Sequence, residues 1–149
     1  MESASLKAEL EANLEYMIED KLMNDCYLDV GILQSPACSN LFDQMLSKAY
    51  GESVEIMDEL NDLITNNDDL NYPEIDKFAS KLHMCMARIG SEKMSRAATV
   101  LRHFAWLNNK ERCLNAFAEF NREYIPFKSD LQRIVELFDL ILKAEAEGK

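Results

Sequence analysis

The sequence predicts an all-α protein, an antiparallel four-helix bundle with two additional helices at its N-terminal side. The chain has 149 residues with only four Gly and three Pro, and a β-sandwich or barrel of this length needs many more turn residues. Apolar residues make up 48% of the chain and charged residues 29%, which suits one core and one solvated surface. We therefore expect a single domain over residues 1–149, because chains of this length commonly form one domain.

Two helices are expected before the bundle, over residues 5–20 and 25–34. The first shows apolar side chains at three- and four-residue spacing, which is typical of a helix with one buried face. The second is shorter and contains Gly31, which weakens a helix. Residues 35–40 are expected to form a loop, and both N-terminal helices to pack over one end of the bundle.

The first two bundle helices have recognisable ends in the sequence. The third helix is expected to begin at Asn40 and to end in the polar run 65–69. The fourth should follow Asn71, because Asn, Pro and Glu occur there in the order of a capped helix start. It should run to residue 89 and stop at Gly90, a residue suited to the left-handed position after a helix.

The fifth helix should follow a Ser91 cap and end before Asn108. The sixth should cover about 110–144, with a kink at Pro126, whose ring removes one backbone donor. Both show a continuous apolar face, so we expect their apolar residues in the core. That set comprises Met94, Ala97, Ala98, Leu101, Phe104 and Leu107 on the fifth helix, and Leu114, Phe117, Tyr124, Leu131, Val135, Phe138 and Leu142 on the sixth.

Charge is distributed unevenly along the chain, whose net charge is −11. Residues 1–75 carry 17 acidic and 3 basic side chains, whereas residues 77–112 carry eight basic side chains and two acidic ones. So acidic a chain is a poor binder of nucleic acid, but a local basic face attracts an acidic protein surface. We expect no membrane span, because apolar runs are short, no secretory signal, and a monomer.

The four cysteines are far apart and form no CxxC pair, so reduced thiols are expected. His83 and Cys85 are two residues apart on one expected helix and cannot face the same ion. The sequence therefore predicts neither a metal site nor a cofactor.

On a helical wheel the fourth helix has an apolar arc and an outward arc. The apolar arc holds Ile75, Phe78, Ala79, Leu82, Cys85, Met86 and Ile89. The outward arc includes the candidate partner-binding residues Asp76, Lys77, Ser80, Lys81, His83, Met84 and Arg88. An exposed methionine among cations is typical of a docking contact between proteins.

The segment NYPEIDKFASKLHMCMARIGSEKM, residues 71–94, resembles the signature of plant histidine-containing phosphotransfer proteins. Asp76, Leu82, Ile89 and Gly90 keep the spacing of that signature without a gap. The segment ERCLNAFAEFNREY, residues 111–124, resembles the start of that family's last helix. The resemblance implies a helical bundle that docks on receiver domains of sensor histidine kinases and response regulators.

Within this resemblance the phosphoacceptor histidine is replaced by Ser80. Lys81 stands at the position of a glutamine, His83 at that of a lysine, and Met84 at that of a glycine. The chain thus resembles the pseudo-phosphotransfer branch, which lacks the histidine. This implies no catalytic residue, no enzymatic activity, a cytoplasmic and nuclear location, and inhibition of a cytokinin-type phosphorelay through receiver binding.

Two alternatives remain open at the level of sequence. His83 could accept phosphate and make the chain an active relay protein, although this shifts the family frame by three residues. Alternatively, the bundle could be a helical adaptor with unrelated partners.

Overall fold

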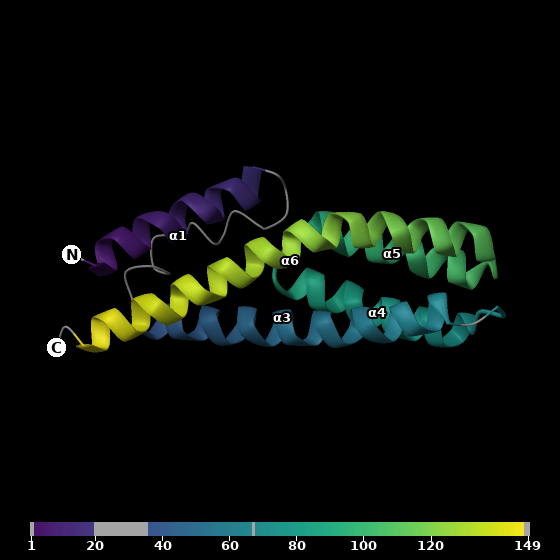
Figure 1. The fold of residues 1–149 in the computed structure, drawn as a ribbon, viewed down its shortest axis with the longest axis horizontal. Coiled ribbons are helices and arrows are strands. Elements are labelled where there is room, and N and C mark those ends of the chain that lie inside the picture. The colour runs from purple at the N-terminus through teal and green to yellow at the C-terminus, as the bar shows by residue number, and fades with distance from the viewer. Residues whose placement is uncertain (1, 20–35, 67, 148–149) are drawn as a thin grey trace.

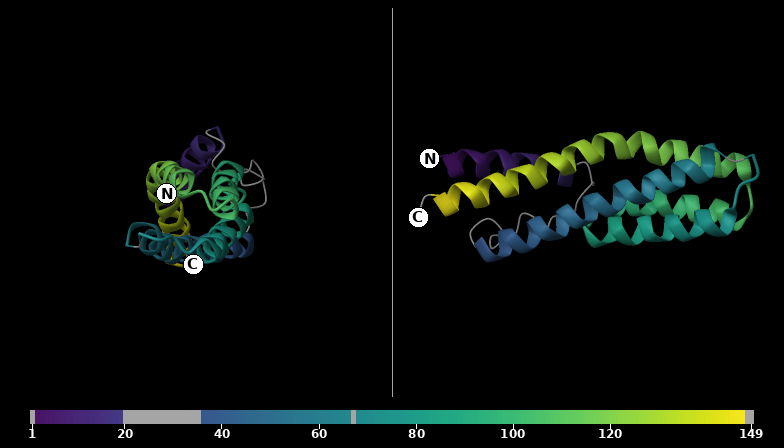
Figure 2. Two further views of the ribbon diagram at one scale, coloured as in Figure 1. Left: turned by 90° about the vertical axis from the view of Figure 1, so that its right-hand side faces the viewer. Right: turned by 60° about the horizontal axis from the view of Figure 1, so that its bottom comes forward.

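The computed structural model describes residues 2–19, 36–66 and 68–147. These residues form helices α1 (Glu2–Glu19), α3 (Pro36–Thr65), α4 (Tyr72–Arg88), α5 (Glu92–Trp106) and α6 (Lys110–Glu147), and contain no strand. Helices α3 to α6 run alternately up and down, and each packs against its neighbours, with α6 closing the ring on α3 (Figure 1). This confirms the predicted antiparallel four-helix bundle. The end-on view in Figure 2 shows α1 outside that ring.

The ends of α4 and α5 follow the predicted caps. The Asn71 side chain accepts a hydrogen bond from the Glu74 backbone N–H at 3.2 Å, and Ser91 accepts one from Met94 at 3.4 Å. Gly90 has a φ of 78°, which only glycine adopts without strain, and lets the chain turn directly from α4 into α5. Asn108 takes a φ of 51° in the turn between α5 and α6.

Helix α3 begins at Pro36, so the expected loop over residues 35–40 is wrong for residues 36–40. Proline is well suited to the first helical position, where its missing N–H would have no partner within the helix. Because proline is also common in loops, the sequence predicted a start at Asn40 instead. The expected helix over residues 25–34 lies outside the described residues.

The core runs through the centre of the bundle and is rich in large apolar side chains. The largest fully buried ones include Phe120, Phe127, Phe138, Leu46, Leu60, Ile75, Leu82, Met86 and Ile89. Leu107 and Leu114 were expected in the core and instead are 57% and 37% exposed. Leu107 is the residue that ends α5, and Leu114 lies one residue beyond the buried Cys113 on α6. Phe78 is half-buried at the edge of the core.

Helices α3 and α6 have 30 and 38 residues, whereas α4 and α5 have 17 and 15, so the long pair extends beyond the short pair. Helix α1 packs along this extension, mainly against α6 (Figure 1). It buries Leu10, Leu14 and Met17 completely. Burial of such a side chain contributes about 1.5–3 kcal/mol, so this face dominates the attachment of α1. Helix α1 thus lies alongside the extension of α6 rather than across the end of the bundle.

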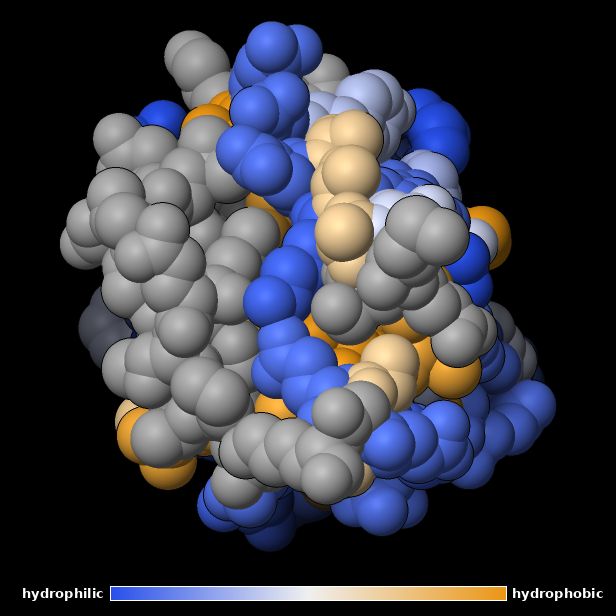
Figure 3. Space-filling model, turned by 90° about the vertical axis from the view of Figure 1, so that its left-hand side faces the viewer, coloured by the Kyte–Doolittle hydropathy of each residue, from blue (hydrophilic) through white to orange (hydrophobic). Residues whose placement is uncertain are grey.

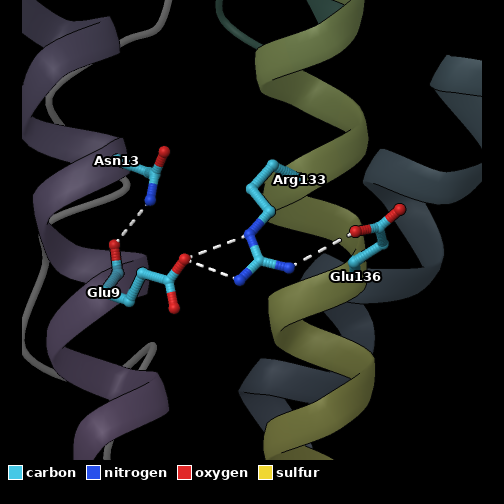
Figure 4. A network of polar contacts seen from close by, with 4 residues as sticks. All are labelled: Glu9, Asn13, Arg133 and Glu136. Carbon is cyan, nitrogen blue, oxygen red and sulfur yellow. Dashed lines mark hydrogen bonds and ion pairs between the residues drawn. The ribbon is translucent and has the colours of Figure 1, made fainter.

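Ion pairs on the surface align α1 with α6. The Arg133 guanidinium contacts the Glu9 carboxylate at 2.6 and 3.1 Å and Glu136 at 3.4 Å (Figure 4). Lys7 pairs with Glu145 at 2.5 Å. Exposed pairs of this kind contribute at most about 1 kcal/mol each. These ion pairs therefore fix the register of α1 along α6 more than they strengthen the attachment of α1 to α6.

Pro126 lies inside α6 without ending it. The ribbon of α6 bends along its middle in Figure 1, as expected for a helix with an internal proline. At the end of the molecule that carries both described chain ends, the coloured residues are mostly hydrophilic, with smaller apolar areas between them (Figure 3).

Candidate functional site on helix α4

The side chains of the outward arc of α4 turn toward two different neighbouring helices. Asp76 and His83 turn toward α5: Asp76 accepts a hydrogen bond from Arg102 Nε at 3.0 Å, and His83 contacts Ser95 and Thr99. Lys77, Lys81, Met84 and Arg88 lie on the side of α4 that faces α3 or solvent. The structure therefore does not bring the seven candidate residues together into one cluster.

His83 is held against α5 through one ring nitrogen. Its Nδ1 lies 2.8 Å from Ser95 Oγ, 3.1 Å from Thr99 Oγ1 and 3.2 Å from the Ser95 carbonyl oxygen. The Thr99 hydroxyl donates its only proton to the Ser95 carbonyl at 3.1 Å, so Ser95 Oγ is the hydroxyl that can donate to an unprotonated Nδ1. A protonated Nδ1 can instead donate to the Ser95 carbonyl. In both states the half-buried ring remains bound to α5.

A groove of about 720 Å³ lies between α4 and α3 on the surface. Its apolar surface comes from Ile56 of α3 and from Phe78 and Met84 of α4. The ammonium groups of Lys77 and Lys81 lie 5.6 and 5.1 Å from the centroid of the Phe78 ring, close enough for cation–π attraction. Lys77 and Lys81 therefore lie around an aromatic ring at the edge of the groove.

The opposite wall of this groove is acidic. Glu52, Glu55, Asp58 and Glu59 of α3 line it, and Arg88 reaches across to Glu52 at 3.2 Å. The basic face expected from the sequence is thus partly neutralised at its Arg88 end. A partner seated here meets carboxylates on the α3 side and cations on the α4 side.

Ser80 and Met84 occupy the middle of the outward arc. Met84 is 59% exposed, as expected, whereas Ser80 is half-buried between the two sides. A serine hydroxyl is a weak nucleophile unless an adjacent base removes its proton. The Nδ1 atom of His83, one turn further along α4, is already bound to Ser95 and Thr99 of α5.

The contribution of α3 and α5 to this site could not be predicted from the sequence. Glu52, Glu55 and Glu59 recur at helical spacing, which signals one acidic face, but the sequence does not show that this face adjoins α4. Ser95 had no predicted role, and Arg102 was counted only among the basic side chains of residues 77–112, because only packing of α5 on α4 brings them to His83 and Asp76.

The described thiols of Cys85 and Cys113 are buried. Cys85 donates to the Ala49 carbonyl at 3.3 Å, and burial raises the pKa of its thiol to about 11. Burial also raises the pKa of Cys113. Both are free thiols; Cys26 and the side chain of Cys38 lie outside the described part of the chain.

Within the described residues, no group of three His, Cys, Asp or Glu side chains could hold a metal ion. In the same part of the chain no helix has the length and apolar character that crossing a membrane requires.

Solved structures with the same arrangement of helices come from plants. A rice protein described as a histidine-containing phosphotransfer protein matches over 95% of this chain and 99% of its own, with a TM-score of 0.79. Histidine-containing phosphotransfer proteins from maize and Medicago truncatula match 91% and 93% of this chain and 99% and 94% of theirs, with TM-scores of 0.73 and 0.74. Each is 19% identical to this chain.

The protein therefore has the fold of the histidine-containing phosphotransfer proteins. No protein-family model and no curated protein matches the sequence.

Proposed function

We propose that this protein binds receiver domains of two-component systems without carrying phosphate, and thereby inhibits a cytokinin-type phosphorelay in the cytoplasm and nucleus. The single observation that carries the proposal is Ser80, which stands at the centre of the outward arc of α4. On this fold, the family resemblance assigns that position to the phosphoacceptor histidine. The fold supports a role in a phosphorelay, and the missing imidazole supports a silent one.

Phosphohistidine relays depend on a nitrogen nucleophile that takes a phosphoryl group from an aspartyl phosphate and releases it again. A phosphoserine is a stable ester, so a phosphoryl group placed on Ser80 would not pass onward. Met84 adds an obstacle, because its exposed side chain occupies the surface that the family's glycine leaves open beside the ring.

Receiver binding is supported by the surroundings of Ser80. Met84 and the half-exposed Phe78 offer apolar contact, and Lys77 and Lys81 surround them with positive charge. The phosphorylation pocket of a receiver domain is acidic, so these cations favour its approach. The candidate residues that bind α5, Asp76 and His83, instead hold the helix in place.

The proposal is tested by transfer from a labelled phospho-receiver, run in parallel with a receiver-binding titration. We expect the wild-type chain to bind the receiver and to take up no label. Ser80→His alone should recover little transfer, since a misplacement of about 1 Å can cost about a hundredfold. The triple change Ser80→His, His83→Lys and Met84→Gly should recover more, although glycine weakens α4 by about 1 kcal/mol.

His83→Ala is the control that separates the alternatives. Acid-labile label on the wild-type chain that disappears in His83→Ala would replace the silent role with an active relay through His83. Failure of the wild-type chain to bind any receiver would favour a helical adaptor with other partners.

A further inference from the structure

A second groove, of about 320 Å³, lies between α5 and α6 and plays no part in the proposed function. It is lined by Ala97, Val100 and Phe104 of α5 and, on the α6 side, by the buried Ala116 and Phe120. Val100 is 47% exposed, and Phe104 is only partly buried. Apolar side chains left exposed beside a groove are typical of an interface with another protein.

The groove carries opposite charges at its two ends. At the end near the α5–α6 turn, the Arg112 guanidinium lies 5.7 Å from the centroid of the Phe104 ring. At the other end lie Glu119, which pairs with Arg122 of its own helix at 3.1 Å on the exposed surface, and Glu123, which lies 4.0 Å from Lys93. Among the described residues Arg112 forms no ion pair, so its charge is available to a partner.

These charges are placed symmetrically about the middle of the groove. Arg112 and Glu119 lie four and three residues from Ala116, about one turn to either side. On α5 the large Phe104 and the small Ala97 lie four and three residues from Val100. A rotation of 180° about an axis through Val100 and Ala116 therefore brings Arg112 onto Glu119 and Phe104 onto Ala97 of a second copy.

We propose that this groove is a self-complementary interface through which two copies of the chain form a weak, symmetric dimer. Such an interface requires that one surface contains both members of each contact, and the groove meets this requirement. The residues of α5 that contact α4, such as Ser95 and Arg102, lie on another side of the helix. Each dimer would thus leave both α4 surfaces open. The sequence expectation of a monomer would then apply only at low concentration.

Charge reversal gives a sharp test by sedimentation velocity, from about 10 μM to about 1 mM, where small interfaces associate. We expect the mass of the wild-type chain to rise from 17.1 kDa toward twice that value. Arg112→Glu and Glu119→Arg should each weaken association by about tenfold or more, since each places like charges together at two equivalent contacts.

An equimolar mixture of the two single variants should associate again. In a mixed dimer every Glu at position 112 faces an Arg at position 119, and every Arg112 faces a Glu119. A dimer held by another surface, or an asymmetric complex, does not predict this recovery. The double variant Arg112→Glu, Glu119→Arg should also dimerise.

Lys48→Glu on α3 serves as the control, because it makes the same change in charge outside the groove. Circular dichroism checks that each variant remains folded, which we expect because both groove residues lie on the surface of α6. A wild-type chain that stays monomeric up to about 1 mM, single variants that dimerise normally, or a mixture that fails to recover would each overturn the proposal.

Discussion

The proposed receiver contact can be tested at Met84, because its exposed fraction sets the binding free energy that its removal should cost. Complete burial of a methionine side chain contributes about 1.5–3 kcal/mol. Because 59% of Met84 remains exposed in the free protein, docking can bury at most that fraction. Met84→Ala should therefore lose about 1–2 kcal/mol of binding free energy, a five- to thirtyfold rise in Kd.

Ile125 provides the matched control for this measurement. It is 60% exposed, but it lies on α6, beside the groove that α6 forms with α3 rather than beside α4. Titration of a receiver domain with Met84→Ala, Ile125→Ala and the wild-type chain should show a loss of affinity in the first variant only. Equal effects of the two changes, or no effect of Met84→Ala, would refute the assignment of the docking surface to α4.

Two further predictions concern the buried pair of Ser53 and Tyr124. Ser53 Oγ donates to the Tyr50 carbonyl at 2.8 Å and so must accept from the Tyr124 hydroxyl at 2.9 Å. Ser53→Ala leaves the buried Tyr124 hydroxyl without a partner and should lower the free energy of unfolding by about 1–3 kcal/mol, measured by urea unfolding. Tyr124→Phe should lower it by about 1 kcal/mol. A larger loss of stability in Tyr124→Phe than in Ser53→Ala would show that the hydrogen bond is oriented differently. Burial raises the pKa of Tyr124 to about 12 and that of Cys85 to about 11, so the unfolded chain releases these protons first and the free energy of unfolding should fall from about pH 9 upward. Urea unfolding measured across that pH range should show a smaller fall in the free energy of unfolding for Tyr124→Phe than for the wild-type chain. An equal fall in both would contradict the raised pKa of Tyr124.

Features encoded within a few residues could be predicted from the sequence. The caps at Asn71 and Ser91 and the turn at Gly90 act through neighbouring backbone groups, so the bounds of α4 and α5 were close to correct. Pro36 shows the limit of such signals, because proline is compatible with both a loop and the first turn of a helix.

The candidate site could be predicted only in part, because its residues depend on packing between helices. The helical wheel placed Met84 outward correctly, since that depends on α4 alone. The attachment of Asp76 to Arg102 and of Arg88 to Glu52 joins residues 26 and 36 positions apart. Local spacing contains no information about such pairs, and therefore the acidic wall of α3 was missed.

The place of α6 in the chain has a consequence for biosynthesis. Helix α1 packs mainly against α6, and α3 also closes the ring through α6, yet α6 follows every other described helix in the sequence. During translation α1 therefore emerges from the ribosome more than a hundred residues before its partner surface exists. Its apolar face, with Leu10, Leu14 and Met17, therefore has no α6 surface to pack against until α6 has been synthesised. Among the described helices, α3, α4 and α5 can begin to pair before α6 has been synthesised.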